Sequence, residues 1–296
     1  MNERVALKPR RVVRKKKPGI WKGLLVVLFA TGLTTLAIHA SDTYRIPGMS
    51  LFAGVGASKI VEHCPLGMAY IPQAGGGYCI DKYEVSAGDH CAFLHPMNET
   101  ETGADMRDSL CAAVSEKEKQ PWVNVPFHDA LRICAKAGKR LPTNKEWYRA
   151  ALGTPDDISE SGESPCALGR TGQTGADDTG ANQKCISSYG TYDMVGNVWE
   201  WVDGGVEAGM YAGRALPDQG FVSSADIDGV PNETAADPVS AFGGDYFYID
   251  KSGTRGMMRG GFWSLKEKAG LYSVNASIPT SFIGNALGFR CVKDAQ

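Results

Sequence analysis

The stretch Tyr189-Gly-Thr-Tyr-Asp-Met-Val-Gly-Asn-Val-Trp-Glu-Trp201 is the most distinctive part of this 296-residue chain. Its pair Gly196-Asn197 permits a backbone bend that the asparagine side chain can support by local hydrogen bonding. Glu200 stands between two tryptophans, and a carboxylate buried in such surroundings needs a partner. That partner is either a cation held by oxygen ligands, as calcium prefers, or an arginine such as Arg259 or Arg290.

Two helices are predicted upstream of this stretch. Apolar residues recur at helical spacing from Asn124 to Gly138, and the closing glycine suits a helix C-cap. The sequence Thr143-Asn-Lys-Glu146 matches a capping box, so a second helix should begin there with Trp147 facing inward.

The rest of the C-terminal part indicates short strands and long loops. Met68–Ile71 and Tyr78–Val85 alternate as strands do, and residues 95–120 suggest a loop with a short helix. Thr154–Gln183 and Gly204–Gly256 show little periodicity and are predicted to be mostly loop. We therefore expect one loop-dominated α+β domain.

The N-terminal residues differ in character from the rest of the chain. The first 22 contain nine lysines or arginines against one acidic residue, and the uncharged run from Gly23 to Ala40 follows them. With Ile20 and Trp21, the segment 20–40 is long enough to cross a bilayer, and the basic cluster should stay cytoplasmic. A signal peptide cleaved after Ala40 is the alternative. The expected organisation is a cytoplasmic tail at 1–22, a transmembrane anchor at 23–40, a linker at 41–63 and a folded domain at 64–296.

Charge and cysteine content bound the function of the remaining chain. Residues 23–296 carry 22 basic and 32 acidic side chains, which argues against a nucleic-acid partner and is compatible with bound cations. All eight cysteines follow the hydrophobic run, and an even number in an exported domain indicates disulfides. No Cys-x-x-Cys occurs. Spacing alone does not determine connectivity; the pairs we expect are Cys64–Cys79, Cys91–Cys111, Cys166–Cys185 and Cys134–Cys291.

Four motifs occur in order along the chain: Gly138–Trp147, Asp193–Trp201, Arg259-Gly-Gly-Phe-Trp263 and Gly288-Phe-Arg-Cys291. Together they resemble the formylglycine-generating enzyme, or sulfatase-modifying factor, family over about Met68–Val292. The resemblance implies a variant of the C-type-lectin fold with little regular secondary structure. It also implies a structural calcium ion, held by Gly196, Asn197, Val198 and Glu200.

The oxidases of that family carry two cysteines soon after the Gly-Gly pair. These thiolates hold copper(I), a soft ion suited to sulfur, and activate oxygen to oxidise a substrate cysteine. Counted from Gly260-Gly261, the matching positions here are Leu265 and Gly270, and neither offers a side-chain ligand. The resemblance therefore predicts no copper and no formylglycine-generating activity.

Other chemistry finds little support in the sequence. A branch of the family binds iron through histidines, but the five histidines here show no pair at helical ligand spacing. A periplasmic branch that matures a siderophore also lacks the copper cysteines. Ser264 and Lys266 form a Ser-x-Lys pair near the expected site, yet no third group orients them. We assign no catalytic residue.

The aromatic residues near the expected site suggest a binding cleft instead. Trp201, Trp263 and Tyr272 are candidates to line it, and Asn275 and Arg290 are candidates for polar contacts. The alternative is that the aromatics belong to the core. We expect a single-pass protein of the inner (cytoplasmic) membrane whose periplasmic or extracytoplasmic domain binds a protein, a peptide or an envelope glycan. The alternative function is a metal-dependent enzyme of the same family that acts on an exported substrate.

Overall fold

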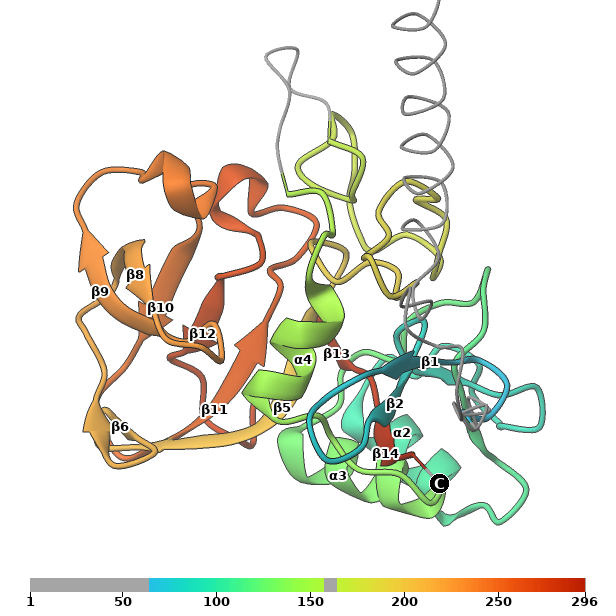
Figure 1. Ribbon diagram of the computed structural model, residues 1–296. Helices are drawn as coiled ribbons and strands as arrows, with labels where there is room; N and C mark the ends of the chain where they lie inside the picture. Colours follow the sequence, from blue (N-terminus) through green and yellow to red (C-terminus); the bar gives the residue numbers. More distant parts are fainter. Residues whose placement is uncertain (1–63, 157–163, 296) are drawn as a thin grey trace, which may run out of the picture. The chain divides into compact units, whose positions relative to one another are not determined.

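The computed structural model describes residues 64–156 and 164–295 (Figure 1). One compact unit runs from Glu62 to Gln296. The expected tail, membrane anchor and linker fall within residues 1–63 and so lie outside the described part of the chain. No helix in the described part has the length and apolar character needed to span a membrane.

The described unit is mostly β, with few helices, and its largest sheet is curled (Figure 1). The strand order in this sheet is β7-β6-β5-β11-β12-β10-β8-β9, and β13 pairs in parallel with β5. The strands are β5 (Trp199–Glu207), β6 (Met210–Tyr211), β7 (Arg214–Ala215), β8 (Gly220–Ala225), β9 (Pro231–Ala235), β10 (Tyr246–Ile249), β11 (Thr254–Arg259), β12 (Val274–Ala276) and β13 (Leu287–Phe289).

The prediction that Gly204–Gly256 is mostly loop is wrong. The segment contains β6 to β10 and parts of β5 and β11. These strands are short, and several are polar: β9 reads Pro-Asn-Glu-Thr-Ala and exposes Asn232 and Glu233. Main-chain pairing with β8 holds β9 in the sheet, so its sequence carries little hydrophobic alternation.

Two small sheets complete the strands. β1 (Met68–Ile71), β2 (Tyr78–Asp81) and β14 (Val292–Asp294) form one, and β3 (Ser86–Ala87) pairs with β4 (Ala113–Val114). The predicted strand Tyr78–Val85 therefore ends early. At its end the buried Asp81 carboxylate accepts the Cys291 N–H at 3.0 Å and the Lys139 ammonium at 2.5 Å.

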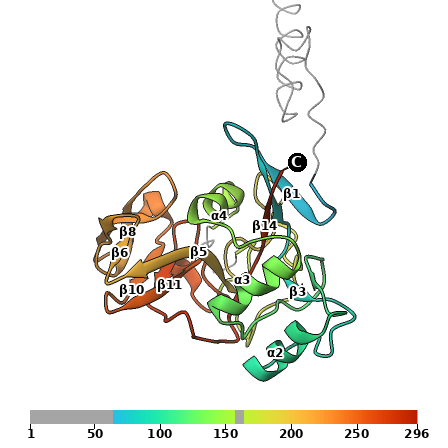
Figure 2. The same cartoon turned by 90° about the horizontal axis from the view of Figure 1, so that it is seen from below.

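Three α-helices lie in the described chain: α2 (Glu99–Arg107), α3 (Phe127–Lys136) and α4 (Asn144–Ala151). The capping box is confirmed: Thr143 Oγ1 accepts the Glu146 N–H at 3.2 Å, and Glu146 Oε2 accepts the Thr143 N–H at 2.9 Å. Helix α3 begins at Phe127, three residues later than predicted, because Asn124 has a φ of 59°, Val125 precedes a proline, and the N-cap Pro126 is extended with a ψ of 159°. It lies beside the end of α2 (Figure 2), where Lys136 donates to the Met106 carbonyl.

All four predicted cysteine pairs form disulfides. Cys134–Cys291 joins α3 to the chain between β13 and β14 across 157 positions of sequence. This bridge holds the end of the Gly-Phe-Arg-Cys motif against a helix from the first half of the domain.

Strands β5 and β11 lie between two hydrophobic clusters. Met257 packs in the cluster that contains Trp147 of α4, and its neighbour Met258 packs in the cluster that contains Ile133 of α3. Successive residues of a strand point to opposite faces, so β11 contributes to both clusters. An apolar pocket, described below, opens on the face of the sheet to which Met258 points.

Candidate functional site

Glu200 is buried in an ion pair with Arg290. Their side chains are 1% and 0% exposed, and Arg290 Nε and Nη2 donate to the two carboxylate oxygens at 2.7 and 2.6 Å. Trp147 Nε1 donates to Glu200 Oε2 at 2.7 Å. Arg290 also donates to the carbonyls of Asp81 and Tyr192, at 3.0 and 2.9 Å. The Arg290 guanidinium therefore joins the end of β2 and the stretch from Tyr189 to Trp201 to the C-terminal motif.

Arg259, the other arginine considered as a partner for Glu200, has a different role. It is fully buried, and its guanidinium donates to the carbonyls of Gly229 at 2.8 Å and Leu271 at 3.0 Å. The same group lies 5.1 Å from the centre of the Trp147 ring. Burial lowers the pKa of Arg259 to about 10, which leaves it charged at neutral pH.

Two more buried carboxylates lie close to the Glu200–Arg290 pair. Glu84 Oε1 accepts a hydrogen bond from the Asn197 side chain at 2.7 Å, whereas Glu84 Oε2 and Asp193 Oδ1 have no partner among the described residues. Burial and the charge of Asp193 raise the pKa of Glu84 well above its ordinary value, and burial raises the pKa of Asp193 to about 6. Carboxyl groups therefore outnumber basic groups beside the Glu200–Arg290 pair, and burial favours the protonated forms of Glu84 and Asp193 unless a cation compensates their charge.

The turn expected to hold calcium is formed, but two of its side chains already have partners. Gly196 and Asn197 adopt φ values of 79° and 54°. The side-chain amide of Asn197 makes hydrogen bonds through both its nitrogen and its oxygen. Both carboxylate oxygens of Glu200 accept hydrogen bonds from Arg290. The Val198 side chain is buried. The unpaired oxygens belong instead to Glu84 and Asp193, which the sequence reasoning missed, although Asp193 lies in the same motif.

An apolar pocket of about 260 Å³ opens where β5, β11 and β12 meet. Three aromatic side chains form much of its wall, and two asparagines supply its polar atoms. No lining side chain is acidic, basic or a thiol. The lining residues are Trp199, Met258, Phe262, Asn275, Ile278, Phe282, Gly284, Asn285, Ala286 and Leu287.

The five predicted ligand contacts are not brought together. Asn275 lines the pocket, whereas Trp201 is fully buried with its indole N–H donated to a backbone carbonyl, and Arg290 is occupied by Glu200. Trp263 packs edge-on against Phe262 outside the lining set. Tyr272 accepts a hydrogen bond from another tyrosine at 3.1 Å, on the opposite side of the sheet. Trp201 and Arg290 are thus core residues and not ligand contacts in this structure.

Three aromatic side chains that line the pocket were not among the predicted ligand contacts. Trp199 is the first residue of β5 and points to the same face of the sheet as Trp201, two residues later. Trp199 lines the pocket, whereas Trp201 does not. Phe262 belongs to the Arg259–Trp263 motif, and Phe282 lies in an otherwise unremarked loop. Strand alternation could have identified Trp199, because it shares a face with the predicted contact Trp201. No local signal identifies Phe282.

The two positions that match the copper cysteines are filled by other packing. Leu265 is half-buried and packs against two hydrophobic clusters, the one that contains Ile133 and the one that contains Leu168. A side chain at Gly270 would overlap the carboxylate of Asp245. Asp245 is fully buried, its Oδ2 accepts the Tyr272 N–H at 2.6 Å, and burial raises its pKa well above the ordinary value. Gly260-Gly261, with φ values of 89° and 85°, keeps the bend that frames these positions.

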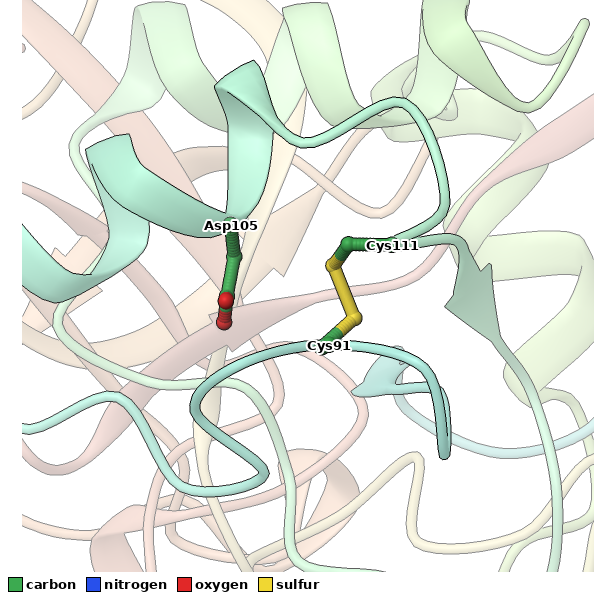
Figure 3. Close-up of side chains that lie close together, drawn as sticks. All are labelled: Cys91, Asp105 and Cys111. Atoms are coloured by element: carbon green, nitrogen blue, oxygen red, sulfur yellow. A yellow bond between two sulfur atoms is a disulfide. The ribbon is translucent and has the colours of Figure 1, made fainter.

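Asp105 lies against the Cys91–Cys111 disulfide (Figure 3). The three side chains are close enough to hold a metal, but both sulfurs are in the disulfide and are not thiolates. Asp105 Oδ1 accepts the Phe93 N–H at 3.1 Å. We therefore read this group as a structural support for the loop that the disulfide closes.

Comparison with known proteins agrees with the motifs. A formylglycine-generating enzyme of Thermomonospora curvata is 32% identical over 106 residues, 30% of this chain and 35% of that protein. The formylglycine-generating enzyme of Mycobacterium tuberculosis is 30% identical over 192 residues, 58% of this chain and 56% of that protein. A Bos taurus protein named inactive C-alpha-formylglycine-generating enzyme 2 is 32% identical over 130 residues, 39% of this chain and 43% of that protein.

These matches span between about a third and just over half of the relatives' own lengths. The family model for the sulfatase-modifying factor enzyme 1-like domain matches residues 72–295, which is most of the chain. The match contains all four motifs, the Glu200–Arg290 pair and the apolar pocket. The chain therefore belongs to the sulfatase-modifying factor enzyme 1-like family.

Proposed function

We propose that the domain binds a protein or peptide partner by taking one of its apolar side chains into the pocket, and that it does not oxidise its ligand. The observation that carries this proposal is the combination of an uncharged apolar pocket with eight cysteines that are all in disulfides. We further propose that the curled sheet is the formylglycine-generating-enzyme variant of the C-type-lectin fold.

The donor set argues against thiolate-based oxidation. A copper(I) centre needs soft sulfur ligands, and the positions for them hold Leu265 and Gly270. Recruiting another cysteine would first require a disulfide to be reduced. The proposal is in line with the name of the Bos taurus relative, an inactive C-alpha-formylglycine-generating enzyme.

The pocket favours an apolar peptide side chain over a sugar. Its volume of about 260 Å³ is below the usual range for small-molecule sites, roughly 300–1,000 Å³, and suits one side chain. Trp199 is only 6% exposed, so it lacks the open ring face on which a sugar would stack. Asn275 Oδ1 accepts from Ser277 N and Oγ, which leaves the Asn275 amide N–H groups for a ligand carbonyl.

We also propose that residues 23–40 anchor the chain in the cytoplasmic membrane, with the domain outside as part of an envelope complex. Four disulfides support this placement, because an oxidising compartment preserves them. The basic residues before position 23 support the orientation.

A capped peptide with a single phenylalanine, Ac-Gly-Phe-Gly-NH2, should bind the full chain with a dissociation constant on the order of 10 mM, since one buried side chain contributes about 2–3 kcal/mol and the backbone adds little more. Methyl NMR of labelled methionines measures this directly. The Met258 signal should shift on titration, whereas that of the exposed Met210, outside the pocket, should not.

Ala286→Leu should fill the pocket and weaken this binding at least about tenfold, because the added methyl groups occupy the ligand's volume. The matched control is Ile227→Ala, at a side chain that is 78% exposed and outside the pocket. Equal binding of Ac-Gly-Ser-Gly-NH2 would contradict the proposal. So would binding of chitohexaose without the peptide, which would point to a glycan, or oxidation of a cysteine peptide by the full chain.

We propose in addition that calcium binds beside the predicted turn. Glu84 and Asp193 would hold it, since each has a buried oxygen without a partner in the described chain, and calcium favours such oxygen ligands. The ion would balance the excess of buried carboxylates. Its role there is structural: to hold the segment before β3 against the turn at Gly196.

Saturating calcium should raise the melting temperature of the full chain by about 5 °C, because a ligand at one hundred times its dissociation constant adds about 2.7 kcal/mol. Glu84→Gln should remove most of this increase by taking away one ligand charge, whereas Glu233→Gln, at an exposed position on β9, should keep it. Differential scanning calorimetry with and without a chelator checks this. The same calcium-dependent rise in Glu84→Gln would rule out this site.

A further inference from the structure

A row of side chains continues from the pocket across the sheet. Met258 pairs with Asn275, and Asn275 pairs with Tyr248 on the next strand. Tyr246 pairs with Phe221 on the strand after that. Residues directly opposite each other share a face of the sheet, as do residues two apart on one strand. The pocket residues Met258 and Asn275 therefore share a face with Tyr248, Tyr246 and Phe221.

The aromatic rings on this face form an unbroken series. Ring centres lie 6.2 Å apart for Trp199 and Tyr248, 4.7 Å for Tyr248 and Tyr246, and 5.0 Å for Tyr246 and Phe221. Both tyrosines are half-buried, and neither hydroxyl has a hydrogen-bond partner within residues 64–156 and 164–295. Burial raises the pKa of Tyr248 to about 12, so its hydroxyl remains a donor at neutral pH.

A lysine lies over the far end of the series. Lys268 ends the 3₁₀ segment η2 (Lys266–Lys268), and its Nζ is 4.6 Å from the centre of the Tyr246 ring and 5.8 Å from that of Phe221. The two rings hold the ammonium by cation–π attraction. No carboxylate of the described chain lies within ion-pair distance of it. The series thus begins at an apolar pocket and ends at an unbalanced positive charge.

We propose that this face binds an extended peptide segment that carries an apolar side chain for the pocket and an acidic side chain for Lys268. The proposal rests on the proposed function and names the ligand more closely. Asn275 is one strand spacing from Tyr246 and two from Phe221, and both lie two residues further along the strands, so the pair is about 8–12 Å from Asn275. An extended peptide in the polyproline II conformation has three residues per turn and rises about 3.1 Å per residue, so side chains three residues apart point to the same side and stand about 9 Å apart. The tyrosine hydroxyls are placed to contact the peptide backbone between them.

Titration of the full chain with designed peptides tests the proposal. The probes are Ac-Ser-Phe-Gly-Ser-Glu-Ser-NH2, the same residues in reverse order, and versions with glutamine or lysine for glutamate or serine for phenylalanine. The glutamate peptide, in at least one direction, should bind about threefold more tightly than the glutamine peptide at low ionic strength. The difference should shrink at 0.5 M salt because the charges are partly exposed.

Lys268→Glu should reverse the preference, so that the lysine peptide binds about threefold more tightly than the glutamate peptide. Lys266→Glu is the matched control: it makes the same charge change two residues away at an exposed side chain and should keep the glutamate preference. Equal binding of the glutamate and glutamine peptides, with phenylalanine still required, would overturn this inference and leave the proposed function standing. Equal binding with serine for phenylalanine, or no binding by any peptide, would overturn both. The same reversal in Lys266→Glu would show general attraction and overturn the pairing with Lys268.

Discussion

Arg290→Ala should lower the free energy of unfolding by about 3–5 kcal/mol, the usual cost of removing one partner of a buried ion pair. The substitution leaves the Glu200 carboxylate buried with the Trp147 N–H as its remaining donor. It also leaves the Asp81 and Tyr192 carbonyls without the guanidinium. Urea unfolding of the full chain with its disulfides intact measures the loss.

The matched control for this prediction is Arg255→Ala. Arg255 also pairs with an aspartate, Asp250, but the pair is partly exposed, with 17% and 44% of the two side chains accessible. Its removal should therefore cost less than about 1 kcal/mol. Arg290→Lys should fall between the two, because it keeps the charge and loses the fork that reaches both Glu200 oxygens. A loss below about 1 kcal/mol in Arg290→Ala would contradict the central role of this pair.

Local signals in the sequence predicted local structure well. The capping box needs only Thr143 and Glu146, three residues apart, and the short disulfides close loops of 15 to 20 residues. The helix with Ile133 and the pair Cys134–Cys291 were also predicted. The four motifs identified the family, whose model matches residues 72–295.

The candidate site depends on contacts that no local pattern specifies. Two arginines were equal candidates to pair with Glu200, and the structure selects Arg290, 90 positions away, by bringing β13 alongside β5. Periodicity could place Trp199 and Trp201 on one face but could not say which of them reaches the surface. Phe282 joins the pocket from the loop between β12 and β13, and no periodicity in that loop predicts where its side chains lie.

Gly270, the position that the resemblance matches to the second copper cysteine, has no room for a larger side chain. Gly270→Cys should destabilise the full chain by about 3 kcal/mol, because its side chain would occupy the space of the buried Asp245 carboxylate. Gly172→Cys is a matched control at an open position, although its φ of 82° adds backbone strain there. Urea unfolding under non-reducing conditions, with a thiol count to confirm that the four disulfides persist, measures both variants.

A double-mutant cycle separates this overlap from other costs of the new side chain. Asp245→Ala alone should cost about 1–3 kcal/mol, since it leaves the buried Tyr272 N–H without its acceptor. In the double variant Gly270→Cys/Asp245→Ala the overlap is gone, so the combined loss should be smaller than the sum of the single losses by at least about 1 kcal/mol. Additive losses would mean that the two residues do not compete for space. A combined loss smaller than the sum would mean that Asp245 occupies the space that a side chain at position 270 needs, so that a thiol can be built there only if Asp245 is also removed. Packing, and not only the absence of cysteines, would then oppose a thiolate metal centre at this position, as the proposed binding function implies.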